Sequence, residues 1–109
     1  MNEQVKIYIE NYPTAIVDKF MALRQLKFDC SNSQVEETLW AKMPTYKVKE
    51  SLVRLIPFKD HINVEAQGVF NYKHQLALYK FTPKGMLQIY LNEQIPTEIL
   101  REIYSKILN

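Results

Sequence analysis

The chain has 109 residues, of which 47% are hydrophobic and 24% are charged, and its formal net charge is +2. This composition is typical of a folded domain and excludes a disordered tail, and because the length accommodates one hydrophobic core, we expect a single domain over residues 1–109. Gly68 and Gly85 are the only glycines, which excludes the glycine-rich dinucleotide-binding, Walker and nucleophile-elbow motifs.

Apolar stretches and cysteines give an expectation about the compartment. No apolar run is as long as a transmembrane helix or the core of a signal peptide. The lone Cys30 cannot form an internal disulfide, and a small domain without disulfides is typical of a reducing compartment. We therefore expect a cytoplasmic protein that does not bind a membrane.

The first part of the chain shows apolar residues at helical spacing. The pattern predicts a short helix over residues 3–12 and a longer amphipathic helix over residues 14–30. Ser33 and Glu36 have the spacing of a capping box, so we expect another short helix that ends before Pro44.

The apolar period changes to two in the middle of the chain. Residues 52–58 and 61–65 are predicted to be two strands joined by a turn at Lys59–Asp60. Pro57 lacks an amide donor, which favours an edge position or a strand end. Helical spacing returns over residues 68–78 and predicts a short helix that crosses back over the sheet.

The last third of the chain predicts a turn, a strand and a helix. Residues 82–85, with the sequence Thr-Pro-Lys-Gly, favour a type II turn in which Gly85 has a positive φ. Residues 86–91 are the last predicted strand, and Pro96 opens a closing amphipathic helix that reaches Leu108. The fold class is therefore α+β, with a small antiparallel sheet of three to four strands against which N-terminal helices, a short crossover helix and a C-terminal helix pack.

Four short motifs follow one another along nearly the whole chain. They are Leu39–Tyr46 with its Met-Pro-x-Tyr step, Phe58–Ile62 with Phe-Lys-x-His-Ile, Tyr79–Gly85 with Tyr-Lys-x-x-x-Lys-Gly, and Ile95–Pro96 before the final helix. In this order they resemble the YdhG-like family, which is catalogued mainly as a domain of unknown function. The resemblance implies a compact α+β fold and no enzymatic activity, and some relatives are labelled frataxin-like iron-binding chaperones.

The sequence departs from that family after His61. The family usually continues with Ile-Gly and an aromatic residue, whereas residues 62–65 here are Ile-Asn-Val-Glu. A glycine permits a ligand to approach the backbone closely. The resemblance therefore does not carry over any function that needs this close approach.

Positive charge is concentrated between residues 42 and 85, which contain eight Lys or Arg and three Asp or Glu. Basic groups among aromatic rings suit a small anionic ligand or an acidic protein surface. A nucleic-acid partner is less favoured, because the pI of 8.6 is below the range typical of such domains and no known motif is present. The candidate ligand-binding residues are Tyr46, Lys59, His61, Tyr79, Lys80 and Lys84.

A metal site is the alternative for the same region. Asp60, His61 and Glu65 lie on or beside one predicted strand, and His61 and Glu65 point to the same face under a period of two. Iron binding of the frataxin kind depends on a dense acidic ridge of oxygen ligands. The acidic residues of the first helices are instead interleaved with lysine and arginine, so we expect no cofactor, with iron as the alternative.

Two function classes therefore stay open. The first is a non-enzymatic, chaperone-like binding domain that uses a basic, aromatic-lined surface near the sheet, and the second is a frataxin-like iron-binding or iron-delivery protein. An enzyme ranks third, because no base, nucleophile and orienting group can be named together. We expect His61 to hydrogen-bond Tyr46 or to lie near Tyr79 and Lys80, and Trp40 to be a packing residue.

Overall fold

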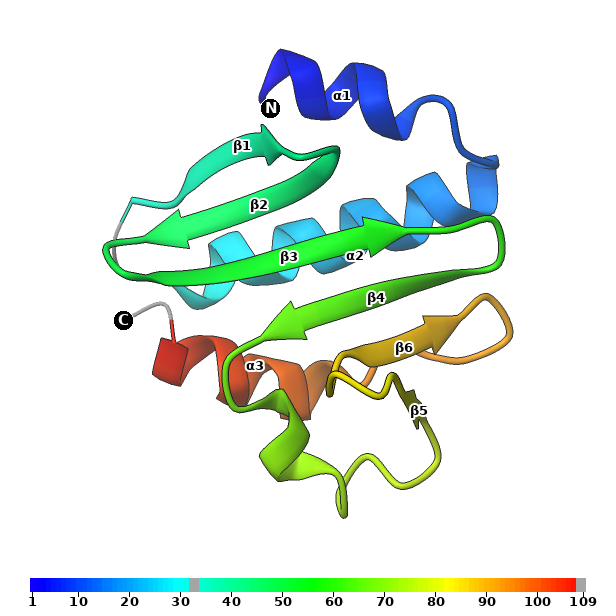
Figure 1. The fold of residues 1–109 in the computed structure, drawn as a ribbon, viewed down its shortest axis with the longest axis vertical. Coiled ribbons are helices and arrows are strands. Elements are labelled where there is room, and N and C mark those ends of the chain that lie inside the picture. Colours follow the sequence, from blue (N-terminus) through cyan, green and yellow to red (C-terminus); the bar gives the residue numbers. More distant parts are fainter. Residues whose placement is uncertain (32–33, 108–109) are drawn as a thin grey trace.

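The structure is a computed structural model that describes residues 1–31 and 34–107 (Figure 1). Its elements, in chain order, are α1 (Glu3–Ile9), α2 (Thr14–Cys30), β1 (Glu36–Trp40), β2 (Met43–Val48), β3 (Ser51–Pro57), β4 (His61–Ala66), the 3-10 helix η1 (Val69–Tyr72), β5 (Lys80–Phe81), β6 (Leu87–Tyr90) and α3 (Thr97–Ile107).

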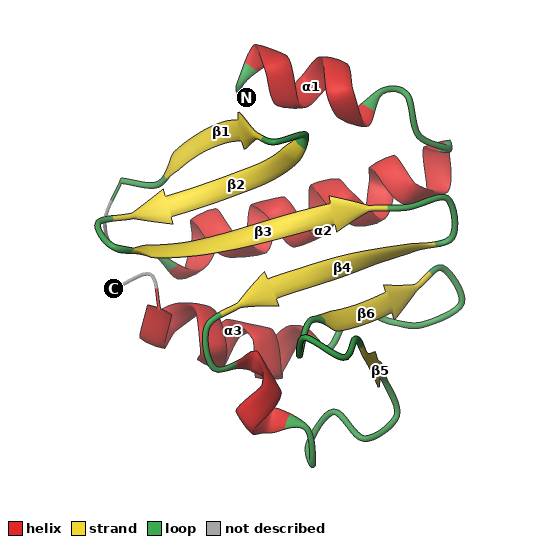
Figure 2. Cartoon of the chain, viewed as in Figure 1, coloured by secondary structure: helices red, strands yellow, loops and turns green. Residues whose placement is uncertain are grey.

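The strands form one antiparallel sheet in the order β1-β2-β3-β4-β6-β5. Figures 1 and 2 show α2 and α3 behind this sheet and α1 beside the β1–β2 hairpin. No helix of the described residues covers the opposite face, which we call the open face. The α+β class is confirmed, but the sheet has six strands rather than three to four. No described helix combines the length and the apolar character that crossing a membrane requires.

Local capping sets the start of the two N-terminal helices. The side-chain oxygen of Asn2 accepts a hydrogen bond from the backbone N–H of Val5 at 3.0 Å, as is typical of a helix N-cap. Pro13 precedes α2, and its carbonyl oxygen accepts hydrogen bonds from the amides of Ile16 and Val17. The predictions of a short first helix and of a helix over residues 14–30 are both confirmed.

The core lies between the sheet and the helices α2 and α3. Side chains alternate along each strand, so that in β4 Ile62, Val64 and Ala66 are buried whereas His61 and Glu65 are only half-buried. The predicted apolar stripe of α2, Cys30 included, is buried on the same side. The largest fully buried apolar side chains are Phe20, Ile9, Ile16, Leu23, Tyr46, Leu55, Ile62, Leu76, Leu87, Ile89 and Tyr104.

Residues 36–48 form a hairpin, so the helix that Ser33 and Glu36 predict is wrong. Ser33 lies outside the described residues, and Glu36 begins β1, which pairs with β2 so that Trp40 lies opposite Met43. An isolated helix of this length is marginal in water. Pairing with β2 satisfies the same backbone groups and adds a strand to the sheet.

The turn of this hairpin is strained. Ala41 and Lys42 form a two-residue connection with φ values of 49° and 62°. A type I′ turn requires positive φ at both positions and usually contains Asn or Gly. A residue with a β-carbon costs about 1 kcal/mol at each such position, so the pairing on either side must hold the turn in place.

The middle strands and the proline at their boundary follow the sequence prediction. β3 and β4 pair over the expected ranges, and Pro57 is the last residue of β3. The predicted helix over residues 68–78 is wrong, because only η1 and a series of turns are present. The apolar spacing in this segment arises because Val69 and Leu76 both reach the core.

The turn over residues 82–85 is a partial success of the prediction. Gly85 has a φ of 87°, as expected. Its N–H donates to the carbonyl of Thr82 at 2.9 Å, which makes Lys84 the third residue of the turn, and Lys84 does not have a positive φ. The turn is therefore type I followed by a left-handed glycine rather than type II.

The chain ends as predicted in a strand and an amphipathic helix. β6 lies within the expected residues 86–91, and α3 begins directly after Pro96. Leu100, Ile103 and Tyr104 of α3 are buried, while Leu108 lies outside the described residues.

Candidate functional site

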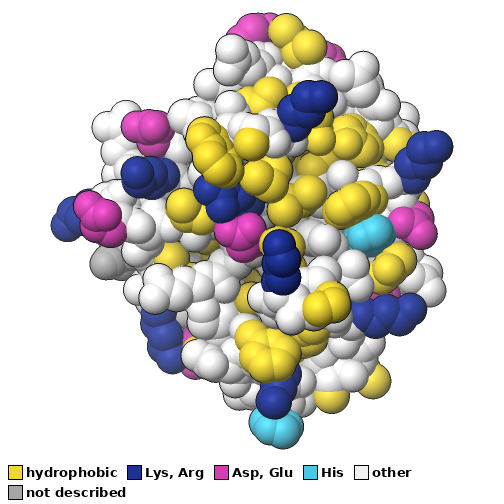
Figure 3. All heavy atoms as spheres, viewed as in Figure 1, with side chains coloured by type: hydrophobic (Ala, Val, Ile, Leu, Met, Phe, Trp, Pro, Cys, Tyr) yellow, Lys and Arg dark blue, Asp and Glu magenta, His cyan; other side chains and the backbone are white. Residues whose placement is uncertain are grey.

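The open face presents rows of side chains that cross the strands. In the pairing register, residues opposite one another lie on the same face, so the burial pattern and the register together define this surface (Figure 3). Hydrophobic side chains gather on it beside Lys and Arg (Figure 3). Its members are Glu36, Thr38, Trp40, Met43, Thr45, Lys47, Leu52, Arg54, Ile56, His61, Asn63, Glu65, Lys80, Gln88 and Tyr90.

Four neighbouring side chains stack into what we call the ring ladder: Phe58 directly after β3, His61 of β4, Tyr90 of β6 and Lys80 of β5. The His61 ring lies parallel to Phe58, with an interplanar angle of 7° and 4.5 Å between centroids, and its centroid is 4.6 Å from that of Tyr90. The Lys80 ammonium is 5.1 Å from the Tyr90 centroid. These separations match the spacing of neighbouring strands, about 4.8 Å. The rings therefore stand side by side across the sheet.

Hydrogen bonds fix the orientation of His61 in the ladder. Nδ1 is 2.7 Å from the Asp60 carboxylate oxygen Oδ1, and because a carboxylate only accepts, Nδ1 carries the proton. Nε2 is then the acceptor that faces the side-chain amide of Gln88 at 3.5 Å. The same amide donates to Asn63 Oδ1 at 3.2 Å. Both ring nitrogens are thus engaged within the sheet.

An apolar stripe continues from the ladder towards the hairpin. Trp40 pairs with Met43. Continuing the β2–β3 register by two residues from the Thr45–Arg54 pair brings Met43 opposite Ile56, two residues before Phe58. Trp40 is 58% exposed and Phe58 is 41% exposed. The prediction that Trp40 is a packing residue is therefore wrong. The apolar stripe consists of Trp40, Met43, Ile56 and Phe58.

Arg54 supports the exposed Trp40 ring from the sheet. Its guanidinium is 4.8 Å from the ring centroid, which is a cation–π distance. The same guanidinium pairs with Glu65 at 2.7 Å and donates to Thr45 Oγ1 at 3.3 Å. A hollow of about 390 Å³ lies beside this group and is also bordered by Lys47.

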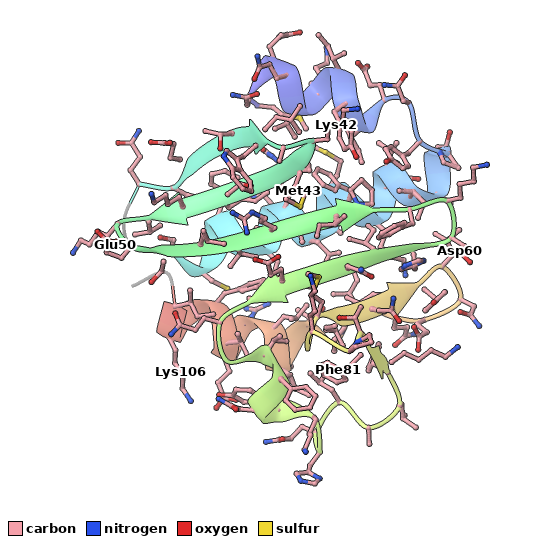
Figure 4. The ribbon with its side chains drawn as sticks, viewed as in Figure 1. Lys42, Met43, Glu50, Asp60, Phe81 and Lys106 are labelled. Carbon is pink, nitrogen blue, oxygen red and sulfur yellow. The ribbon has the colours of Figure 1, made fainter. Side chains whose placement is uncertain are left out.

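The lysines at the rim remain exposed, whereas nearby acids are engaged. Asp60 bonds to His61, and Glu65 pairs with Arg54. Figure 4 shows Lys42 at the tip of the β1–β2 hairpin and Asp60 in the β3–β4 turn, both at the same end of the strands. The rim lysines are Lys42, Lys59, Lys80 and Lys84, all exposed. Positive charge therefore exceeds negative charge around the apolar stripe.

The structure brings together some of the predicted ligand-binding residues and separates others. His61 and Lys80 meet at Tyr90, and Lys59 lies in the turn beside them. Lys84 lies in the turn between β5 and β6. Tyr79 precedes β5 and donates to the carbonyl of Gln94 at 2.5 Å.

Tyr46 lies on the other side of the sheet. Its side chain is fully buried towards the helices, and its hydroxyl donates to Glu37 Oε2 at 2.8 Å. The expected hydrogen bond between His61 and Tyr46 is therefore absent, because the two side chains point to opposite faces. Tyr90, which sequence reasoning did not select, occupies the place expected for Tyr46, and its position opposite His61 follows from the β4–β6 register.

The predicted metal-binding residues do not converge. Asp60 and His61 are in contact, but Glu65 is four residues further along β4, about 13 Å away, and it pairs with Arg54. Among residues 1–31 and 34–107, no group of three or more His, Cys, Asp or Glu side chains is placed to hold a metal ion.

A second polar cluster, which sequence reasoning missed, lies on the helix side of the sheet. Glu37 accepts two hydrogen bonds from Arg24, at 2.6 and 3.1 Å, one from Tyr46 and one from the backbone N–H of Asn2 at 2.7 Å. Burial acts to raise the pKa of Glu37, but the hydrogen bonds from Arg24, Asn2 and Tyr46 outweigh it and lower the pKa. We call these residues, together with Lys27, the buried cluster.

Lys27 is the unusual member of the buried cluster. Its side chain has no exposed area, and its Nζ lies 4.0 Å from the Tyr46 ring centroid and has no hydrogen-bond partner among the described residues. Burial lowers the pKa of Lys27 well below its ordinary value, and Arg24 adds to this effect while Glu37 opposes it. The available signal was its position, because Lys27 follows Phe20 and Leu23 on the apolar stripe of α2.

Comparison of the chain with protein-family models, with curated proteins and with solved structures finds no match. The resemblance to the YdhG-like family therefore stays a prediction.

Proposed function

We propose that this chain is a non-enzymatic, chaperone-like binding module whose open face binds an acidic polypeptide. The observation that carries the proposal is the ring ladder with its adjoining apolar stripe, which stands on a sheet face that no described helix covers and which exposed lysines surround. Antiparallel sheets commonly leave one face to water, but that face then usually carries polar side chains. Large exposed apolar groups with a charged rim instead indicate a binding surface.

The shape of the surface favours a polypeptide partner over a small anionic ligand, which is the other partner that the sequence suggests. Small molecules bind in concave sites that bury most of their surface. The ladder and the stripe instead extend across several strands. An extended segment with acidic side chains can contact the apolar groups and place its carboxylates near Lys59 and Lys80, where charge complementarity also speeds association.

Nucleic acid fits the ladder less well. Single-strand binders offer free ring faces on which bases stack. Here both faces of His61 are occupied, one by Phe58 and one by Tyr90, and Tyr90 also carries the Lys80 ammonium. No free face of His61 therefore remains for a base.

The test is a titration of the isotope-labelled protein with poly-L-glutamate, followed by NMR. We expect shift changes at Lys59, His61, Lys80 and Tyr90, and binding that weakens as salt rises. The double variant Lys59→Glu/Lys80→Glu should bind at least about tenfold more weakly. Lys73→Glu/Lys106→Glu is the matched control, because it changes the net charge equally and Lys106 lies on α3 behind the sheet (Figure 4).

Three outcomes would contradict the proposal. The first is shift changes confined to the helix side, and the second is equal weakening by the two double variants. The third is tighter binding of a single-stranded oligouridylate, which would assign the surface to nucleic acid.

A further inference from the structure

The β1–β2 hairpin offers a site that differs from the rest of the open face. Trp40 is the only tryptophan of the chain and is 58% exposed, yet its ring is held in one orientation. Arg54 contacts the ring at 4.8 Å and is itself held by Glu65 and Thr45. An exposed aromatic residue that is ordered before binding loses little conformational freedom when a partner arrives.

The turn next to Trp40 adds to this order. Ala41 and Lys42 both have positive φ although neither is glycine. Such conformations persist only where the surrounding structure determines them, and they occur often at binding sites. The Trp40–Met43 pair closes the hairpin directly beside this turn, so the strand pairing holds the turn in this conformation.

The hollow beside Trp40 has the size and lining of a subsite for one side chain. Its volume of about 390 Å³ is near the lower limit for ligand pockets, about 300 Å³. Leu52 and the Trp40 ring supply apolar surface, and the stems of Lys47 and Arg54 add aliphatic carbon. A large apolar side chain fits this lining better than a charged group does.

The charges around the hollow define what flanks that side chain. Lys47 borders the hollow, whereas Lys42 lies two residues after Trp40 at the hairpin tip and borders a separate hollow beside α1; both lysines are exposed. The one acid in the lining, Glu36, lies directly opposite Lys47 in the β1–β2 register, and the lining holds two cations, Lys47 and Arg54, against this one carboxylate. The positions beside the apolar side chain therefore favour acidic residues.

We propose that the hollow beside Trp40 is an anchor subsite, which takes one large apolar side chain of the acidic polypeptide while Lys42 and Lys47 bind the acidic residues on either side. This inference rests on the proposed function. It adds one requirement, which is that the acidic segment of the partner carries an aromatic or large aliphatic residue. Binding hot spots are commonly formed by Trp and Arg in this way.

The experiment compares two fluorescein-labelled peptides by anisotropy. Both consist of alternating Glu and Ser, and one carries a central Phe where the other carries Ser. We expect the Phe peptide to bind at least about tenfold more tightly than the Ser peptide. The unlabelled Phe peptide should also change the tryptophan fluorescence of the wild-type protein, excited selectively over that of the tyrosines, which reports on Trp40 alone because no other tryptophan is present.

Variants then locate the anchor. Trp40→Ala should lose at least about tenfold affinity for the Phe peptide and leave the Ser peptide unaffected, while Trp40→Phe should retain most of the affinity. Leu78→Ala is the matched control, because Leu78 is an apolar side chain that is 93% exposed outside this region. Should Trp40→Ala fail to fold, the comparison of the two peptides on the wild-type protein still tests the inference.

The outcomes separate this inference from the proposed function. If both peptides bind equally and Trp40→Ala binds like the wild type, the anchor is refuted while the acidic-partner function stands. If neither peptide binds, both are refuted. If sedimentation shows a dimer that Trp40→Ala dissociates, the hollow is occupied by a second copy of this chain and the anchor proposal is overturned.

Discussion

The two faces of the sheet carry similar ionic and aromatic residues, but those on the helix side are buried and those on the open face are partly exposed. On the helix side, Glu37, Arg24 and Tyr46 form a closed network in which the carboxylate accepts four hydrogen bonds. On the open face, His61 and Arg54 are also held by carboxylates, but the aromatic rings that they contact remain partly exposed.

The difference shows which face carries stability and which is available for binding. A buried ionic network strongly destabilises the fold when one member is removed, because the remaining charge has no water to solvate it. A network at an exposed face is solvated again by water after such a change. Substitutions of similar chemistry on the two faces should therefore differ in their cost and in what they affect.

The largest expected effect is that of Glu37→Gln. The side chain of Glu37 is only 7% exposed, and the amide cannot pair with the Arg24 guanidinium or accept the same hydrogen bonds. We expect a loss of about 3 kcal/mol in the free energy of unfolding, measured by urea denaturation. Glu65→Gln, which removes the carboxylate from Arg54 on the open face, is the matched control and should cost less than about 1 kcal/mol. Equal costs would contradict the distinction between the faces.

The pH dependence of Glu37 sharpens this prediction. Its pKa is lowered in the folded protein, so its ionised form contributes stability above the unfolded pKa of about 4.3. That contribution is lost as pH falls through the lowered folded pKa. The difference in stability between the wild type and Glu37→Gln should therefore shrink in acid.

Lys27→Met should change stability in the opposite direction. The Lys27 amine is buried without a hydrogen bond to any described residue. Replacing a buried ionisable group by an apolar one of similar size often stabilises a protein, here by about 2 kcal/mol. Lys19→Met serves as the control, because the Lys19 ammonium donates to the carbonyls of Glu93 and Tyr90. A stability loss in Lys27→Met would mean that the contact with Tyr46 stabilises more than burial costs.

The sign of the pH effect for Lys27 follows from its lowered pKa. Between the lowered folded pKa and the unfolded value of about 10.4, the unfolded chain binds more protons than the folded one. Stability of the wild type therefore rises with pH across that window. The advantage of Lys27→Met should therefore grow as pH falls from about 10 towards the lowered folded pKa.

His61→Ala is the corresponding test on the open face. It removes both ring contacts and the hydrogen bond to Asp60, and we expect a loss of about 2 kcal/mol in the free energy of unfolding. His61→Phe keeps a ring between Phe58 and Tyr90 and should lose about half as much. If the two variants cost the same, the stacking contributes nothing and the hydrogen bond carries the effect.

The sequence predicted the elements in which local pattern and tertiary structure agree. The apolar stripe of α2 and the alternation of β3 and β4 appear where the chain indicates them. The β1–β2 hairpin could not be predicted in the same way, because Ala41–Lys42 lacks the Asn or Gly that marks such a turn. The geometry of the turn is imposed by the pairing of the two strands. A local pattern cannot report a conformation that distant contacts hold.

Only part of the candidate site could be predicted from the sequence, for a related reason. His61 and Lys80 could be selected from residue type, but their meeting at Tyr90 depends on β6 lying between β4 and β5. Tyr46 was chosen by the same reasoning and faces the helices, because a shift of one residue along a strand reverses the side chain. Lys27 was not selected from the sequence, although its spacing matches the buried stripe of α2.

The smallest effect should come from Gly85→Ala, which tests a turn that belongs to neither network. Gly85 has a φ of 87°, and an added β-carbon would lie 3.5 Å from Phe70, an ordinary contact distance. The cost therefore comes from the backbone alone and should be about 1 kcal/mol in the free energy of unfolding, measured by urea denaturation.

Gly68→Ala should cost a similar amount, because Gly68 has a φ of 84° and also has space for a β-carbon. Lys49→Gly should show the reverse sign, since Lys49 already has a positive φ of 54° without being glycine. An unchanged stability in Gly85→Ala would contradict the type I turn with its left-handed glycine. A loss well above that of Gly68→Ala would instead indicate that the turn supports the Lys80 end of the ring ladder and so belongs to the open face.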